Sequence, residues 1–154
     1  MTLDEIEARE AIRHTLAQYV VAGDQRDSAT FANTFTEDGT LEMTTGTVTG
    51  RKTIHDWVAE AKPFGDGEQR PAPTFMRHYM STTLIEFTSQ TTANVRAYFT
   101  VVSDVGPDHA GYYVDRFRKT HDRWLIEHRR VRIMWRADNS YVLPEAVAKP
   151  RAAQ

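Results

Sequence analysis

The stretch that decides the fold is AGYYVDRFRKTHDRWLIEHRRVRIMW, residues 110–135. Its two halves, 110–120 and 124–135, are rich in Val, Tyr, Phe and Ile, which are residues that favour β-strands. Only a short polar turn at 121–123 separates them. Because a connection this short joins antiparallel neighbours, the stretch predicts a hairpin of two long strands.

Two more strands precede this hairpin. Segments 74–87 and 93–104 have the same composition, and polar turns at 88–90 and 106–108 separate them from their neighbours. Four consecutive strands with short connections predict an antiparallel meander. The tail, 137–154, follows no strand pattern, although its apolar residues at 141–143 are suited to docking. We expect this tail to close over a pocket.

The N-terminal part of the chain predicts helices. Residues 3–22 carry an apolar stripe at helical spacing, and Gly23 is typical of a helix end, so Asp24 lies where the chain leaves the helix or in its last turn. Shorter helices are expected at 28–35 and 52–61. A turn at residues 37–39 and a hairpin at residues 41–49 should lie between them. Helices followed by consecutive strands are typical of an α+β domain.

The composition is that of one ordinary globular domain. The chain has 154 residues, of which 40% are hydrophobic and 26% charged, and its net charge of −2 gives no reason to expect nucleic acid or an anionic membrane as a partner. The absence of cysteine excludes thiol catalysis and disulfides. The acidic N-terminus has no apolar h-region, and no segment approaches the ~20 apolar residues of a membrane span. We therefore expect a cytoplasmic protein.

The strand around His78 is the first candidate for chemistry. Alternation places Met76, His78 and Met80 on one face, and the next strand turns Phe99 and Val101 inward. These faces form the wall of a core or of a pocket. The pattern alone also fits His78 as a core histidine with one hydrogen bond, and Asp24 as a solvent-exposed acid at a helix end.

A family resemblance brings Asp24 and His78 together. The stretches that carry it are YVVAGDQRD at 19–27, RHY at 77–79, DRF at 115–117 and WLI at 124–126, followed by Arg129. In this order they resemble the SnoaL-like (NTF2-like) family over roughly residues 5–136. The resemblance implies a cone-shaped α+β fold, in which a curved antiparallel sheet wraps around three N-terminal helices and encloses an apolar pocket. It divides the chain into a domain at 1–136 and a tail at 137–154.

The family includes dehydratases and dehydrochlorinases, and the resemblance implies that Asp24 and His78 form their catalytic pair. Tyr19 matches a tyrosine that lines the pocket, and Arg132, after a gap of one residue, matches a pocket arginine. We expect the inward residues of the two strands to contact the substrate as well; they are Met76, Met80, Phe99 and Val101. Family enzymes carry a second acid or a histidine on the strand of Val101, and this sequence has none there.

An Asp–His pair suits the removal of a proton next to a leaving group or a carbonyl. The sequence therefore predicts a lyase or isomerase that acts on a small, mostly apolar, cyclic substrate. No metal-site spacing, phosphate loop or nucleophile elbow occurs, so we expect no cofactor and no metal. Of the other histidines, His109 is expected at a loop edge and His121 in a turn.

Two other function classes stay open. Domains of this shape also serve as non-catalytic binding modules for small molecules or proteins, and as structural subunits like the β subunits of ring-hydroxylating dioxygenases. We expect a homo-oligomer, a trimer or a dimer, because many apolar side chains should face outward from the sheet. These side chains are Tyr79, Ile85, Phe87, Tyr98 and Val102.

Overall fold

The computed structural model describes residues 1–61 and 70–149. Within them, the helices are α1 (Leu3–Gln25), α2 (Ser28–Ala32) and α3 (Arg51–Glu60). The strands are β1 (Phe35–Met43), β2 (Gly46–Thr49), β3 (Met76–Phe87), β4 (Thr92–Ser103), β5 (Gly106–Thr120) and β6 (Arg123–Arg136). A single 3₁₀ turn, η1, follows at Pro144–Ala146.

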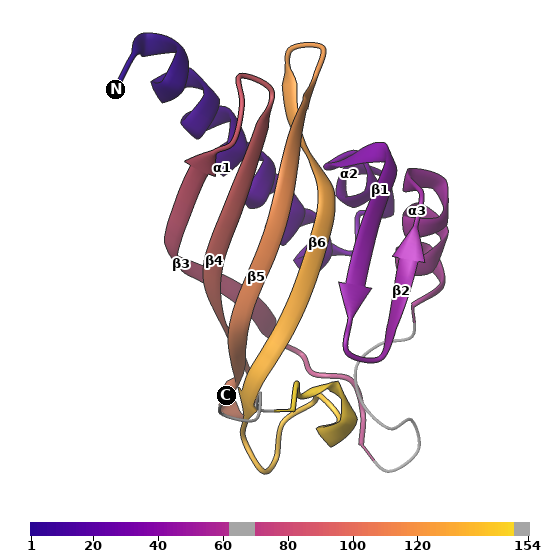
Figure 1. Cartoon of the computed structure of the whole chain (residues 1–154). Coiled ribbons are helices and arrows are strands. Elements are labelled where there is room, and N and C mark those ends of the chain that lie inside the picture. The colour runs from indigo at the N-terminus through magenta and orange to yellow at the C-terminus, as the bar shows by residue number, and fades with distance from the viewer. Residues whose placement is uncertain (62–69, 150–154) are drawn as a thin grey trace.

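The strands form one curved, unclosed sheet in the order β2-β1-β6-β5-β4-β3. The meander of β3 to β6 is antiparallel throughout, as predicted. Strand β1 joins it parallel to β6, which the sequence did not predict. In Figure 1, α1 runs across the back of β3 to β6, while α2 and α3 lie beside β1 and β2. The predicted cone-shaped α+β fold is confirmed.

The segment before the first hairpin was predicted wrongly. The second helix ends at Ala32 rather than at residue 35, and the expected turn at 37–39 lies inside β1. The pairing of β1 with β6 is irregular between Phe35 and Thr40. A Cβ atom on Gly39 would lie 2.9 Å from the Cβ of Phe35 and 3.1 Å from the carbonyl oxygen of Ile126. Glycine is needed because the backbone passes so close to its neighbours at this irregularity.

A bulge in β3 changes which side chains face the core. The register with β4 shifts between Met80 and Thr83, and such a shift reverses the alternation of inward and outward residues. Met76, His78 and Met80 therefore face inward as predicted, whereas Ile85 and Phe87 also pack in the core instead of facing outward. Tyr79 and Tyr98 are exposed, as expected.

The described part of the tail docks against β6. The N–H of Ala148 donates to the carbonyl oxygen of Ile133, and Val147 forms a parallel bridge with Ile133. The Nε of Arg136 donates to the carbonyl oxygen of Val142 at 2.8 Å. Residues 150–154 and most of the loop predicted at 63–73 lie outside the described residues. No helix within 1–61 and 70–149 is long and apolar enough to cross a membrane.

Candidate active site

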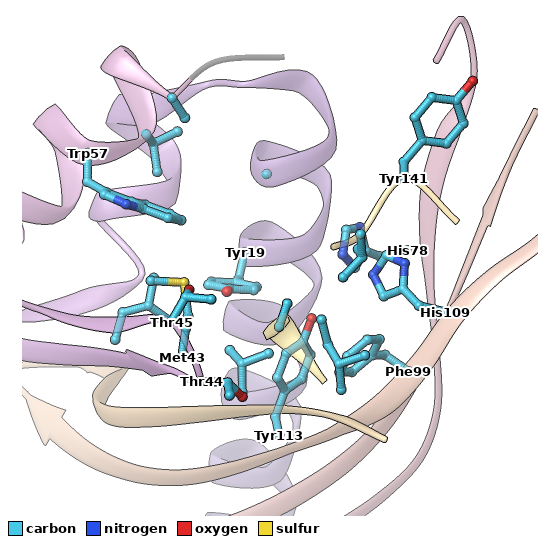
Figure 2. Close-up of a pocket in the computed structure, with 18 of the residues that line it drawn as sticks. Tyr19, Met43, Thr44, Thr45, Trp57, His78, Phe99, His109, Tyr113 and Tyr141 are labelled. Carbon is cyan, nitrogen blue, oxygen red and sulfur yellow. The ribbon is translucent and has the colours of Figure 1, made fainter. Parts of the chain in front are cut away.

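A cavity of about 500 Å³ lies between the inner face of the sheet, α1, α3 and the tail (Figure 2). Its size falls in the range that binds drug-sized molecules. Most of the wall is apolar, with contributions from Phe31, Leu41, Phe99 and Val131. The polar groups are few, and the two histidines His78 and His109 are among them. A mostly apolar cavity with few polar groups is typical of a small-molecule site.

Asp24 and His78 meet at the wall of this cavity, as the sequence predicted. Helix α1 runs past Gly23 to Gln25, so Asp24 lies in its last turn. One oxygen of Asp24 (Oδ1) is 2.7 Å from Nδ1 of the His78 ring, and the other (Oδ2) accepts the backbone N–H of His78 at 3.1 Å. Because an ionised carboxylate only accepts hydrogen bonds, Nδ1 carries the proton that is donated to Asp24, and in the neutral form of the ring Nε2 keeps its lone pair. The side chain of Asp24 is only 8% exposed, whereas that of His78 is 26% exposed.

A second histidine stands beside the first. The ring centroids of His78 and His109 are 6.2 Å apart, and the planes are nearly perpendicular, at 84°. The Nδ1 of His109 is 2.7 Å from Oδ1 of Asp108, so this histidine is also paired with a carboxylate. Burial lowers the pKa of His109, against the opposing charge of Asp108. The ring is therefore neutral at pH 7, and its Nε2 is available to accept a hydrogen bond or a proton.

The expectation that His109 lies at a loop edge was wrong. Strand β5 begins at Gly106, and its register with β4 shifts so that Val101 pairs with His109 while Val102 pairs with Pro107. Asp108 is therefore the extra residue of a β-bulge, and both Asp108 and His109 are buried. The sequence has no histidine at position 101, but His109, the partner of Val101 on β5, provides a second histidine at the same place in the sheet.

Two tyrosines close the floor of the cavity over a buried arginine. The guanidinium carbon of Arg129 lies 4.0 Å from the ring centre of Tyr19 and 4.1 Å from that of Tyr113. Arg129 is fully buried and donates to Asp115 through Nε at 2.9 Å and Nη2 at 2.6 Å. Burial raises the pKa of both tyrosine hydroxyls, although Arg129 opposes the change. Both hydroxyls are therefore protonated at neutral pH and able to donate hydrogen bonds.

The other predicted substrate contacts fall outside the cavity. Met76 and Met80 pack against the core, and Met80 lines a shallow groove between α1 and β3. Val101 is fully buried on β4, between its strand partners His78 on β3 and His109 on β5. Arg132 lies on the opposite face of β6, where its Nη2 donates to Glu42 at 2.9 Å. Strand alternation explains this placement, because its neighbours Val131 and Ile133 line the cavity.

Sequence reasoning missed His109 and Tyr113. The signal was present, since His109, Gly111, Tyr113 and Asp115 recur at a period of two and mark one face of a strand. Reading residues 106–108 as a turn placed His109 at a loop edge instead of on this face. A Cβ atom on Gly111 would lie 1.9 Å from the carbonyl oxygen of Arg132, so only glycine allows β5 and β6 to approach there.

The described residues hold no group of three or more His, Cys, Asp or Glu side chains arranged to bind a metal ion. Each of the two Asp–His pairs has a single carboxylate on its imidazole. Such an arrangement suits proton transfer by the histidines themselves.

Comparison with known proteins agrees with this architecture. A family model described as a SnoaL-like domain matches residues 4–130. No curated protein matches the sequence. The chain is 24% identical to a candidate scytalone dehydratase from Novosphingobium aromaticivorans, with a TM-score of 0.79 over 99% of this chain and 100% of that one.

Two further solved structures show the same fold. One is a hexachlorocyclohexane dehydrochlorinase from Novosphingobium barchaimii, with 19% identity and a TM-score of 0.70 over 92% of this chain and 99% of that one. The other is a protein of unknown function from Mycobacterium tuberculosis, with 24% identity and a TM-score of 0.68 over 88% of this chain and 81% of that one. At these identities the likeness shows the fold alone.

Proposed function

The chain belongs to the SnoaL-like domain family, and from this premise we propose that it is a lyase or isomerase that works without a cofactor on a small, mostly apolar, ring-bearing substrate. The observation that carries the proposal is the Asp24–His78 pair at the wall of an apolar cavity of about 500 Å³. Neighbouring structures include a dehydrochlorinase and a candidate scytalone dehydratase, and both names describe eliminations.

The Asp24–His78 pair supports a general-base role for His78. Asp24 fixes the ring with its proton on Nδ1, so Nε2 takes the proton from a substrate carbon beside a carbonyl. The electrons of that C–H bond form the new double bond, and a hydroxide or halide leaves with the electrons of its own bond. A departing hydroxide takes up the proton that Nε2 has gained and leaves as water, whereas with a halide that proton passes to solvent. In an isomerisation the proton returns at another carbon, and nothing leaves.

The two tyrosines on the floor of the cavity support the stabilisation of developing negative charge. The hydroxyls of Tyr19 and Tyr113 are protonated, and both residues line the cavity (Figure 2). A hydrogen bond from either to a substrate carbonyl grows stronger as the oxygen becomes negative in the transition state. Arg129 lies behind the two rings, but the buried carboxylate of Asp115 balances most of its charge, so the two hydroxyls are the main donors.

One observation favours a non-catalytic binding module as the second candidate. Asp24 also accepts the backbone N–H of His78, so it ties the end of α1 to β3 whether or not the ring does chemistry. A ligand-binding protein would need this tie and the apolar cavity, but it would not need a free Nε2.

Proton abstraction from a probe distinguishes the two candidates. The protein is incubated in D₂O with a panel of cyclic ketones and cyclic β-hydroxy ketones, and loss of the α-proton signal and growth of enone absorbance are followed. Wild-type protein should exchange or dehydrate at least one probe. The His78→Ala variant should lose this activity by about 10²- to 10⁴-fold. His14→Ala, an exposed histidine on α1, is the control and should keep it.

Binding of the probes without any exchange or elimination would support the binding module. Equal activity in wild type and His78→Ala would refute the catalytic role of the pair.

A further inference from the structure

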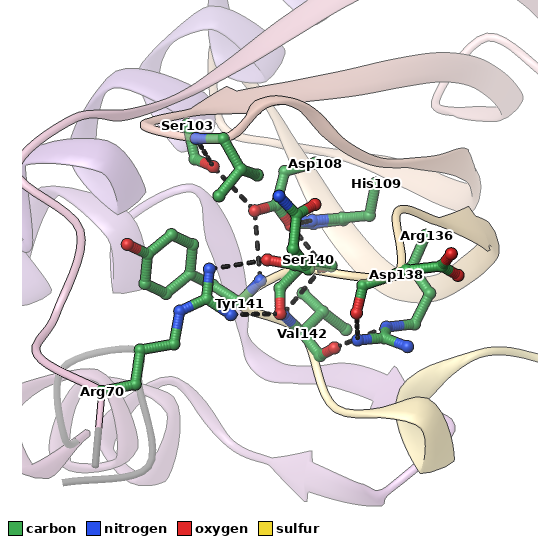
Figure 3. Close-up of polar contacts among 11 residues, drawn as sticks. Arg70, Ser103, Asp108, His109, Arg136, Asp138, Ser140, Tyr141 and Val142 are labelled. Atoms are coloured by element: carbon green, nitrogen blue, oxygen red, sulfur yellow. Dashed lines mark hydrogen bonds and ion pairs between the residues drawn. The ribbon is translucent and has the colours of Figure 1, made fainter. Parts of the chain in front are cut away.

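The buried carboxylate of Asp108 accepts four hydrogen bonds. Its Oδ2 accepts from Ser103 Oγ at 2.7 Å and from the backbone N–H of Tyr141 at 3.1 Å. Its Oδ1 accepts from Ser140 Oγ at 2.5 Å and from His109 Nδ1 at 2.7 Å (Figure 3). Burial raises the pKa of Asp108, but these donors outweigh it and hold the pKa below its ordinary value. The carboxylate is therefore ionised at neutral pH.

Two of these four donors belong to residues 139–146 of the tail, which we call the strap. The strap runs over the cavity, and Tyr141, Val142 and Leu143 form part of its wall. Its other anchors are two arginines. Arg70 donates to the carbonyl oxygen of Ser140 at 2.8 Å and stacks on the ring of Tyr141 at 3.6 Å, while Arg136 holds Val142.

The same carboxylate therefore contacts both the strap and a histidine that lines the cavity. Asp108 is the bulged residue of β5, so it and His109 both point inward although they are neighbours in the chain. His109 lines the cavity beside His78. If the strap lifts, Asp108 loses the donors from Ser140 and Tyr141, and water reaches His109.

We infer that Asp108 is a positioning residue that couples docking of the strap to the orientation and tautomer of His109, so that the second pocket histidine is set only when the cavity is covered. The inference rests on the proposed function, in which His78 takes a proton from a substrate in this cavity, and it adds a role for His109, which lines the cavity beside His78. It goes beyond that function because it gives the hydrogen bonds between the strap and Asp108 a role, which is to set His109 when the strap is docked.

The groups around His109 fix the direction of the expected change. Asp108 lies on its own strand, His78 with Asp24 approaches from β3 and α1, and Tyr113 shares its strand face. The strap contributes Tyr141 and Glu145 to the same cavity. Since burial is the main cause of the lowered pKa of His109, hydration on strap opening should raise that pKa toward its ordinary value of about 6.5.

Two serines provide a matched test. Ser140 and Ser103 are each 5% exposed, and each donates to Asp108. Each also accepts a backbone N–H two residues further on, from Val142 at 3.0 Å and from Val105 at 3.3 Å respectively. Ser140→Ala and Ser103→Ala therefore remove equal numbers of hydrogen bonds, but only Ser140→Ala releases the strap.

The readouts are the ¹⁵N signals of the His109 ring against pH and the hydrogen exchange of the Tyr141 and Val142 amides. Wild type should show one tautomer, with the proton on Nδ1. In Ser140→Ala, exchange in the strap should quicken about thirtyfold, as expected for two lost hydrogen bonds of ordinary strength. The pKa of His109 should rise, and the single tautomer should give way to a mixture. Ser103→Ala should leave the exchange rates of the strap amides unchanged, and it should change the pKa and the tautomer of His109 less than Ser140→Ala does.

Equal changes of His109 in the two variants, or no change in Ser140→Ala, would overturn the coupling. Ser140→Thr keeps the hydroxyl and should restore the wild-type titration. These measurements need no substrate, so they separate this inference from the proposed function. A protein that turns over nothing but shows the His109 change would refute the function and leave the coupling standing.

Discussion

Replacing Asp24 by Asn tests whether Asp24 and His78 act as one unit. The carboxylate accepts twice from the same residue, at 2.7 Å from the ring and at 3.1 Å from the backbone N–H. An Asn amide has only one acceptor atom. If its oxygen keeps the backbone N–H, its NH₂ group faces Nδ1 of the ring, and two donors cannot meet.

The ring of His78 then has to move its proton to Nε2, which removes the lone pair that faces the substrate. The charge that stabilises the imidazolium is lost as well. We therefore expect Asp24→Asn to lower kcat by about 10²- to 10⁴-fold, nearly as much as His78→Ala, because either change removes the general base. The double variant should be little worse than His78→Ala alone, because residues that act as a unit are not additive.

The assay is the rate of α-proton exchange or enone formation with the best probe of the panel, measured for wild type, both single variants and the double variant. Circular dichroism and urea unfolding show whether each variant is folded. Losses that multiply in the double variant would refute the unit while leaving the cavity as a binding site. Full activity in the folded Asp24→Asn variant would refute the role of the carboxylate.

Three further predictions concern stability and assembly. Because the pKa of His109 is lower in the folded protein, the unfolded chain binds the proton first as pH falls, and the folded state should lose stability below about pH 6.5. Urea unfolding at pH 7.5 and 5.5 should show a smaller loss of stability in His109→Gln than in wild type. An equal loss in the two proteins would contradict this prediction. Arg129→Met leaves Asp115 buried without its partner and should cost about 3–5 kcal/mol in the same assay, whereas a cost below about 1 kcal/mol would contradict the pairing. We propose that the outer face of the sheet, where Tyr98 is 47% exposed, joins copies of the chain. Light scattering should show an oligomer for wild type and a weaker one for Tyr98→Glu. A wild-type monomer at micromolar concentration would refute the proposal.

The fold was predictable because its long elements carry strong patterns. The four meander strands alternate, and their connections are too short for anything but antiparallel pairing. Bulges are harder to predict, because one extra residue leaves no compositional mark yet reverses every later side chain. The bulge after Met80 turned Ile85 and Phe87 inward for this reason. The parallel pairing of β1 with β6 depends on contacts between residues some ninety positions apart, such as Phe35 with Ile126.

The candidate site was predictable only in part, and for the same physical reason. Asp24 and His78 came from matching residues, and alternation placed Phe99 correctly on the inner face. The prediction that Arg132 lines the pocket was wrong because matching it required a gap of one residue. A shift of one residue moves a strand side chain to the other face of the sheet. His109 was missed because a bulge, rather than a turn, follows Gly106.

Both carboxylates of the site occupy positions that are unfavourable for a negative charge. Asp24 lies in the last turn of α1, where the helix dipole disfavours a negative charge by about 0.3–1 kcal/mol. Asp108 is 0% exposed, at a bulge that interrupts the ladder between β4 and β5. In each case the cost is offset by hydrogen bonds, including one from Nδ1 of a histidine whose ring lines the cavity. A core that needed only to be stable could fill both positions with apolar residues at less cost. The coincidence of two such exceptions, each paired with a histidine and both bordering one cavity, is what an acid–base site requires and what packing alone does not explain.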